Sequence, residues 1–397
     1  MIYDPAAHES LTDARFDRAG AEAFVVDTVR ILAAAYDPDR GWQLHPEDDY
    51  GDPEGAVNQG VYFGTAGSLW ALWRLAERYD IGLPFDCARA IERCEEQFER
   101  FPAEERTPSY LLGLAGIAFV RYLVTNDFGA LDRYRDAAAR NVDNPTREYL
   151  WGAPGTVVPA LLLREHTGDR RFDPLIRVVQ EELWKSWDAQ SEDASFLWLQ
   201  ELYGHRRRFV GAGHGAISNI AVFVRALDLL HEDRRPELAL RLRTMLERYA
   251  IIDGRAVNWY GLGTKDADQN RMQWCHGAPG IITSLTWLEP TDDTIEDLLC
   301  RGGNGIWQAG PLKKGPTLCH GTAGNGFAFL ELARRTGDEM WQDRAQRFAA
   351  HAIEQTRQWH ATFGMPSASL WTGDAGVALY VDAVLRDDSR ILSNGGL

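Results

Sequence analysis

Two Cys-His-Gly tripeptides are the part of this 397-residue chain best suited to chemistry. They lie in Trp274-Cys275-His276-Gly277 and in Leu318-Cys319-His320-Gly321. Two thiolates and one imidazole form a soft ligand set that suits zinc and leaves one tetrahedral position open. An open position favours a catalytic site over a structural one, because zinc lowers the pKa of a bound thiol enough to present a thiolate near neutral pH.

The alternative is that each cysteine is a small buried apolar residue. Two cysteines in the same position of a repeated motif argue against that alternative. The residues alone leave three candidates for the nitrogen ligand, namely His214, His276 and His320.

Two further residues are suited to proton transfer. His214 directly precedes Gly215, as His276 and His320 precede their glycines, so it is expected to bind metal or to act as a general acid or base. Glu148 lies four residues before Gly152 and could orient a site histidine or take part in proton transfer. The alternative for Glu148 is a solvated loop carboxylate.

Cations precede both Cys-His-Gly tripeptides. Arg271 lies four residues before Cys275, and Lys314 lies five before Cys319. Their charges could stabilise an enolate or hold a substrate carboxylate. The run Arg206-Arg207-Arg208, which precedes His214, could extend this basic patch or be an ordinary solvated charge run.

A recurring Gly-x-x-Gly pattern is expected to position these residues. Successive copies begin 49, 39, 63, 62, 44 and 52 residues apart, which is room for two helices and a loop. Ser218 replaces the second glycine of the fourth copy. The seven copies begin at Gly64, Gly113, Gly152, Gly215, Gly277, Gly321 and Gly373.

The segments around these glycines predict two layers of helices. Those after the glycines carry few charges, as in 68–73 and 327–330, and suit an inner layer. Amphipathic segments at 89–98, 237–249 and 343–355 suit an outer layer. Because no repeat reads as a polar cap, the pattern predicts one all-α domain over 1–397, a closed α/α toroid whose motif starts gather at one mouth. Segments 252–273 and 302–316 are rich in glycine and are predicted to be irregular loops.

Composition limits the classes of partner. The chain is 45% hydrophobic and carries 58 acidic against 42 basic residues, a formal charge of −16, which disfavours nucleic acid and anionic membranes. Five cysteines are too few for a disulfide framework. The start at Met1 lacks the features of a signal peptide, so we expect a cytoplasmic protein.

The segments 274–280 and 318–325 closely resemble the lanthionine synthetase C-like family, and the resemblance runs from Gly64 to about Tyr380. It implies an (α/α)7 barrel with zinc held by Cys275, Cys319 and His320. It also implies that His214 protonates an enolate, with Arg271 as electrostatic helper.

Three other residues relate the chain to branches of that family. Glu148 falls where bacterial cyclases carry an aspartate. Lys314, in Lys313-Lys314-Gly315, and His276, where many cyclases have tyrosine, are closer to the eukaryotic glutathione-binding branch and are expected to bind substrate.

The resemblance implies a zinc enzyme that adds glutathione to dehydroalanine or dehydrobutyrine in a peptide or protein. The first alternative is a lantibiotic cyclase, in which a precursor peptide supplies its own cysteine and a separate dehydratase acts beforehand. The second is a noncatalytic scaffold that binds zinc and glutathione. A metal-free glycosidase-like barrel is disfavoured, since it would place paired carboxylates where this chain has Cys-His pairs.

Overall fold

The inner helices all begin at the glycine motifs. The computed structural model describes residues 1–48, 56–187, 195–266, 270–289 and 292–389. In these residues, the first glycine of each of the seven motifs is the N-cap of a helix, as the repeat predicts. These helices are α2 (Thr65–Tyr79), α4 (Leu114–Thr125), α6 (Ala153–Thr156) with its continuation α7 (Val158–Thr167), α9 (Ala216–Arg225), α11 (Ala278–Ser284), α13 (Thr322–Thr336) and α15 (Asp374–Arg386).

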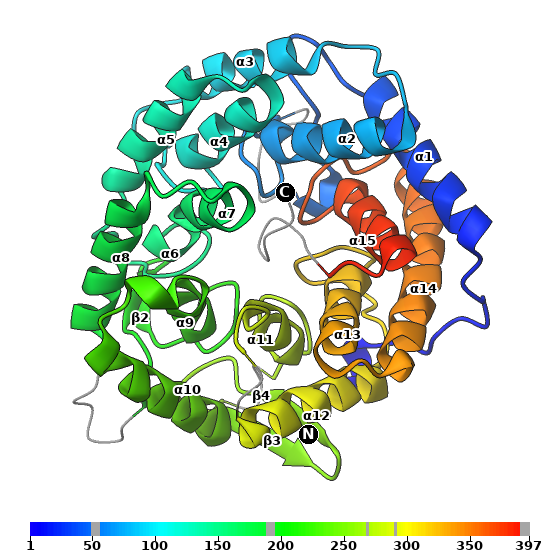
Figure 1. Cartoon of the computed structure of the whole chain (residues 1–397). Helices are drawn as coiled ribbons and strands as arrows, with labels where there is room; N and C mark the ends of the chain where they lie inside the picture. Colours follow the sequence, from blue (N-terminus) through cyan, green and yellow to red (C-terminus); the bar gives the residue numbers. More distant parts are fainter. Residues whose placement is uncertain (49–55, 188–194, 267–269, 290–291, 390–397) are drawn as a thin grey trace.

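Longer amphipathic helices surround this inner ring (Figure 1). The predicted segments 89–98, 237–249 and 343–355 all lie in them, which confirms the two layers. Helix α1 packs against α2 and α15, and α15 also contacts α2, so the ring is closed. The outer helices are α1 (Arg18–Ala34), α3 (Cys87–Phe98), α5 (Phe128–Ala139), α8 (Asp173–Ser186), α10 (Arg235–Tyr249), α12 (Asp293–Ala309) and α14 (Glu339–Phe363).

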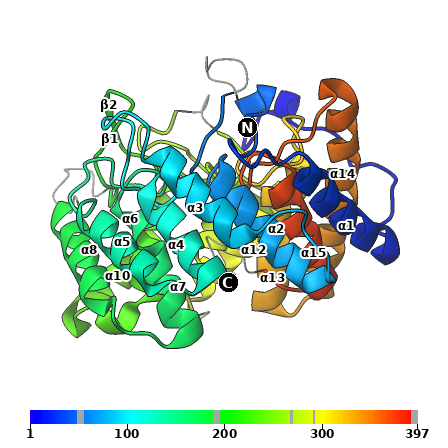
Figure 2. The ribbon, with the colours of Figure 1, turned by 90° about the horizontal axis from the view of Figure 1, so that it is seen from above.

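Short elements complete the chain. Strands β1 (Gln200–Leu202) and β2 (His205–Arg207) form an antiparallel hairpin with Leu202 opposite His205, at the end of the ring where the N-terminus also lies (Figure 2). Strands β3 (Ala250–Asp253) and β4 (Ala256–Trp259) form a second hairpin. Four 3-10 helices are η1 (Pro5–Ala7), η2 (Pro46–Asp48), η3 (Leu227–Leu229) and η4 (Glu232–Arg234). In the described part of the chain, no helix is both long and apolar enough to cross a membrane.

The prediction of irregular loops at 252–273 and 302–316 is wrong in part. Strand β4 lies in the first segment, and α12 extends through the glycines of the second. These glycines serve close packing: a Cβ at Gly302 would contact the Trp259 ring, and one at Gly305 would overlap the Val257 carbonyl. Strand β4 can therefore lie directly on α12. Glycine content alone predicts a loop at this part of α12, because it does not show the strand that packs there.

A run of five backbone hydrogen bonds links the residues that lie two places before six of the first glycines. In each bond the N–H donates to the carbonyl of the corresponding residue in the next repeat. The bonds run from Gly213 to Cys275 (3.1 Å), Cys275 to Cys319 (3.2 Å), Cys319 to Trp371 (2.9 Å), Trp371 to Tyr62 (2.9 Å) and Tyr62 to Leu111 (2.8 Å). The corresponding N–H of the third motif, that of Leu150, donates to the Glu148 carboxylate instead. The approaches to six of the inner helices are thereby fixed to one another.

The second glycine of each motif allows the chain before the helix to pack on the first helical turn. A Cβ at Gly116 would overlap the carbonyl oxygen of Tyr110, and the same holds for Gly324 and Leu318. Gly67, Gly155, Gly280 and Gly376 meet carbonyls in the same way. These close contacts account for the repeat as a packing device.

We therefore expect Gly116→Ala to destabilise the protein by about 1–3 kcal/mol through overpacking. Helix propensity alone would change stability in the opposite direction, by about 1 kcal/mol. Urea unfolding checks the effect. The matched control is Ser218→Ala, because Ser218 occupies the same motif position with its Cβ already accommodated. A Gly116→Ala protein as stable as the parent would contradict the packing argument.

Candidate active site

One pocket of about 820 Å³ contains almost all the side chains that the sequence singles out. The exceptions are the run Arg206-Arg207-Arg208 and Glu148, which is fully buried and contacts the pocket residue His214. The residues from the sequence prediction that line the pocket are His214, Arg271, Cys275, His276, Lys314, Cys319 and His320. The prediction that the motif starts meet at one mouth of the ring is confirmed.

The two cysteines are neighbours and are both buried. The Cys319 thiol hydrogen-bonds the Cys275 sulfur, which lowers the pKa of Cys275 to about 7 and raises that of Cys319. Gln273, which the sequence analysis did not identify, donates its side-chain N–H to Cys275 Sγ at 2.9 Å. The pair therefore holds one thiolate close to one thiol.

The imidazoles of His276 and His320 are neutral at physiological pH. Burial, aided by the charge of Arg271, lowers the pKa of each to about 3, and Lys314 adds to the effect at His320. Neutral imidazole is the form that binds a metal.

The ligand set remains a prediction. In the described residues, no three His, Cys, Asp or Glu side chains are grouped closely enough to hold a metal ion. Cys275, Cys319 and His320 share one pocket and are the right chemical types for zinc. The donor types fit a zinc ion, but His320 does not converge with the two sulfurs in this structure.

His214 is held by a buried carboxylate. Its Nδ1 lies 2.9 Å from Glu148 Oε2, and the same carboxylate accepts the backbone N–H groups of Leu150 and Trp151. Burial disfavours the charged imidazole, but the Glu148 hydrogen bond and charge outweigh it, so the pKa of His214 is raised. The solvated-carboxylate alternative for Glu148 is wrong, because this turn removes the side chain from water.

Backbone contacts fix the loop that carries Arg271. Asn258 on β4 donates to the Arg271 carbonyl at 3.2 Å and accepts from the Ala278 N–H at 2.9 Å. Gly277 has a φ of 114°, and a Cβ there would overlap the Arg271 carbonyl. The loop and the start of α11 are thereby held together. Asn258 is a supporting residue that local sequence spacing does not reveal.

The two lysines before the sixth motif have different positions. Lys314 lines the pocket, whereas the Lys313 ammonium donates a hydrogen bond to the Ala6 carbonyl, with 3.0 Å between Nζ and the oxygen. Lys314 is therefore the one of the two placed to meet a ligand in this pocket.

Aromatic residues that the sequence analysis did not identify form another wall of the pocket, among them Phe63, Phe101, Trp151 and Tyr203. Tyr203 is 66% exposed, and its ring centroid lies 6.0 Å from that of His214. Trp151 Nε1 donates to the Tyr203 hydroxyl at 3.4 Å. The wall gives the pocket a broad apolar surface beside its polar end.

Tyr203 stands at the tip of the β1–β2 hairpin. Tyr203 and Gly204 have φ values of 51° and 74°, as a two-residue type I′ turn requires. A bulky residue is uncommon in that region, where asparagine or aspartate usually precedes the glycine. The Tyr-Gly pair between two short polar segments was therefore a weak signal for this hairpin.

Arg206, Arg207 and Arg208 do not extend the basic patch of this pocket. They line a separate cavity, whose described lining contains neither Arg271 nor Lys314. Arg206 and Arg207 are exposed, as the alternative of a solvated charge run predicts.

Comparisons with known proteins agree with this arrangement. The chain is 33% identical over 193 residues to glutathione S-transferase LANCL1 of Danio rerio, which covers 48% of this chain and 44% of that protein. It is 26% identical over 333 residues to LanC-like protein GCL1 of Arabidopsis thaliana, covering 77% and 73%. Among solved structures, nisin cyclase matches the fold with a TM-score of 0.63 at 14% identity, over 94% of this chain and 98% of that one.

The lanthionine synthetase C-like protein family matches residues 55–393, which include all seven glycine motifs and the whole pocket. This chain therefore belongs to the lanthionine synthetase C-like family and has its α/α toroid fold.

Proposed function

We propose that this protein is a zinc-dependent enzyme that adds the thiol of glutathione to a dehydroalanine or dehydrobutyrine residue in a peptide or protein. The observation that carries the proposal is the position of the Cys275–Cys319 pair in the same pocket as His214, whose imidazole contacts the buried Glu148 carboxylate. The first pair suits activation of a thiol, and the second suits delivery of a proton.

Cys275, Cys319 and His320 would hold the zinc ion, whose contribution is to lower the pKa of a thiol bound to it. Gln273 orients the Cys275 sulfur through its hydrogen bond. The neutral state of His320 at physiological pH is compatible with ligation.

The remaining residues serve the addition itself. The thiolate attacks the β-carbon of the dehydroamino acid, a carbon–sulfur bond forms, and the π electrons of the double bond move toward the carbonyl as an enolate. Arg271 and Lys314 are the cations of the pocket that would stabilise this charge. His214 then gives its proton to the α-carbon, and the Glu148 carboxylate favours the protonated imidazole by raising the pKa of His214.

Glutathione is favoured as the thiol by the chemistry of one end of the pocket. It carries two carboxylates, and Lys314 is suited to pair with one of them while Arg271 remains beside the reacting atoms. The zebrafish relative is named a glutathione S-transferase, which points the same way.

A second candidate function is ring closure within a peptide that supplies its own cysteine. The observation in its favour is the aromatic wall, since Phe63, Phe101 and Trp151 offer room for apolar side chains that glutathione lacks. The two functions share the addition step and differ only in the source of the thiol.

The direct test incubates purified protein with a cysteine-free dehydroalanine peptide, with and without glutathione, and reads the product by mass spectrometry. We expect a glutathione adduct only in the complete reaction. A parallel peptide that contains both cysteine and dehydroalanine tests ring closure, which leaves the mass unchanged and removes the free thiol. Cyclisation without any glutathione adduct would favour the second candidate, and absence of both products would contradict the proposed activity.

Metal analysis tests the ligand set. We expect about one zinc ion per chain, and its loss in Cys275→Ala and Cys319→Ala, because each removes a thiolate ligand. The matched control is Cys300→Ala, since Cys300 lies on α12 outside the pocket. Circular dichroism reports helix content for all variants. Full zinc in both pocket variants would rule out these ligands.

The Glu148–His214 pair predicts a pH effect. His214→Ala should retain zinc and lose about 10²- to 10⁴-fold in turnover, the usual contribution of a general acid or base. The Glu148 carboxylate raises the pKa of His214, and the charge of Cys275 adds to this. Glu148→Gln should therefore lower the pKa of His214 and move the alkaline decline of kcat to lower pH. A pH profile unchanged by Glu148→Gln would remove this pair from the proton transfer.

A further inference from the structure

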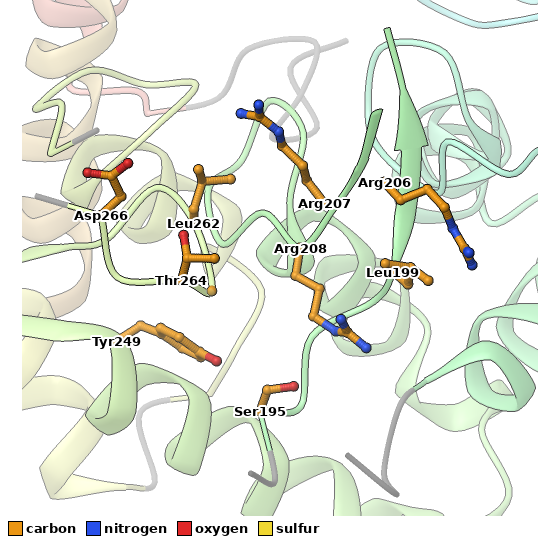
Figure 3. Close-up of a pocket in the computed structure, with 10 residues that line it drawn as sticks. Ser195, Leu199, Arg206, Arg207, Arg208, Tyr249, Leu262, Thr264 and Asp266 are labelled. Atoms are coloured by element: carbon orange, nitrogen blue, oxygen red, sulfur yellow. The ribbon is translucent and has the colours of Figure 1, made fainter. Parts of the chain in front are cut away.

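A second cavity, of about 900 Å³, is lined in part by Arg206 and Arg207 of strand β2 (Figure 3). Its cationic lining is the run Arg206-Arg207-Arg208, which the proposed reaction does not use. Ser195 and Thr264 add hydroxyl groups, and Leu199, Leu262 and Tyr249 add apolar surface. The cavity thus combines positive charge with surface that suits a polypeptide.

The charge of this cavity contrasts with that of the whole chain, whose formal charge is −16. In the described residues, no ion pair involves Arg207, and its side chain is exposed. Arg206 pairs with Glu201 at 3.3 Å, but both side chains are more than half exposed, so a competing carboxylate can replace Glu201 at little cost. Lys265 lies over the Tyr249 ring at 5.7 Å and adds a further cation.

One carboxylate, that of Asp266, also lines the cavity. Figure 3 shows Asp266 and Arg206 at opposite sides, with Arg207 and Arg208 between them. Among the described residues that line the cavity, cations therefore outnumber carboxylates, and the cations come from β2 and the residue that follows it.

The second cavity and the active-site pocket share a wall. Tyr203 at the hairpin tip lines the active-site pocket, while Arg206 and Arg207 on β2 line the second cavity. Phe209 continues this wall: its ring centroid lies 6.0 Å from that of His214, and it bridges to Leu262 of the second cavity. A polypeptide in the active-site pocket could therefore cross the hairpin and reach the arginines.

We infer that the second cavity binds a carboxylate-rich segment of the polypeptide that carries the dehydroamino acid. Guanidinium groups pair with carboxylates in two-bond geometry, and the apolar lining suits the side chains between them. The site would attract acidic substrates to a protein whose overall charge repels them. The statement that the bound segment belongs to a substrate rests on the proposed function, whereas binding itself does not.

Binding can be measured without the reaction. A fluorescent peptide rich in Glu and Asp, lacking any dehydroamino acid, is titrated with the protein and followed by anisotropy against its Gln/Asn counterpart. We expect the acidic peptide to bind more tightly, less so as NaCl is raised. The double variant R206E/R207E should weaken its binding about tenfold, the combined effect of reversing two exposed charges.

The matched control is Arg255→Glu, which reverses an exposed charge at the turn of the other hairpin, between β3 and β4. It should bind the acidic peptide as the parent does. Equal binding by R206E/R207E and the parent, or equal loss with Arg255→Glu, would overturn the inference. Displacement of the acidic peptide by inorganic phosphate at concentrations below those of glutamate would overturn the assignment to carboxylates.

Kinetics separate this inference from the proposed function. In a series of dehydroalanine peptides, a block of Glu and Asp residues stands two, six or ten residues before or after the dehydroalanine. These spacings span roughly 7–35 Å in an extended chain. For the best spacing, R206E/R207E should raise KM about tenfold with kcat unchanged, and leave the neutral peptide unaffected. Binding without adducts from any peptide would leave the cavity assignment standing and refute the proposed reaction. Adducts that form equally well on acidic and neutral peptides would leave the proposed reaction standing and refute the cavity assignment.

Discussion

The run of backbone hydrogen bonds before six of the inner helices is the constraint on which the rest of the structure depends. It occupies the N–H of Cys275 and its carbonyl, and likewise those of Cys319, so each residue has its backbone fixed by two neighbours in the run. In every motif except the fourth, where Ser218 takes the place, the second glycine lets the preceding chain pack on the first helical turn, since a Cβ would overlap a carbonyl oxygen there. The side chains of adjacent repeats are thus brought together by backbone geometry that does not depend on their own chemistry. The run of hydrogen bonds is therefore able to carry cysteines at two positions and Tyr62 or Trp371 at others.

The pocket built on this run of hydrogen bonds holds imidazoles in two different charge states. His276 and His320 are desolvated beside Arg271, and their pKa falls to about 3. His214 is buried too, yet the Glu148 carboxylate reverses the effect and raises its pKa. Environments that separate the pKa values of like groups are how one site provides both neutral ligands and a proton donor. The position of one carboxylate thus determines which histidine is suited to proton transfer.

Sequence could predict the parts of the structure that repeat. The glycine spacing gave the inner helices, their common mouth and the grouping of Cys275 with Cys319, because each follows from the same local packing in every unit. The features it missed depend on contacts between distant segments. Burial of Glu148 comes from a turn that it closes itself, with His214 approaching from another repeat, 66 residues along the chain. Gly302 and Gly305 predict a loop from the sequence, because their contacts with Trp259 and Val257 appear only in the folded chain.

The β1–β2 hairpin shows how non-repeating segments can adapt a regular ring. Cys275 and Cys319 come to the pocket from the start of two inner helices, and the β1–β2 hairpin adds Tyr203 to its lining. A two-residue turn places Tyr203 beside His214, whereas Arg206 and Arg207 of the strand that follows line a different cavity. Three residues, from Tyr203 to Arg206, are enough to change from an aromatic surface to a cationic one. The chemistry of the two surfaces can therefore vary with this hairpin while the run of hydrogen bonds that holds the cysteines stays unchanged.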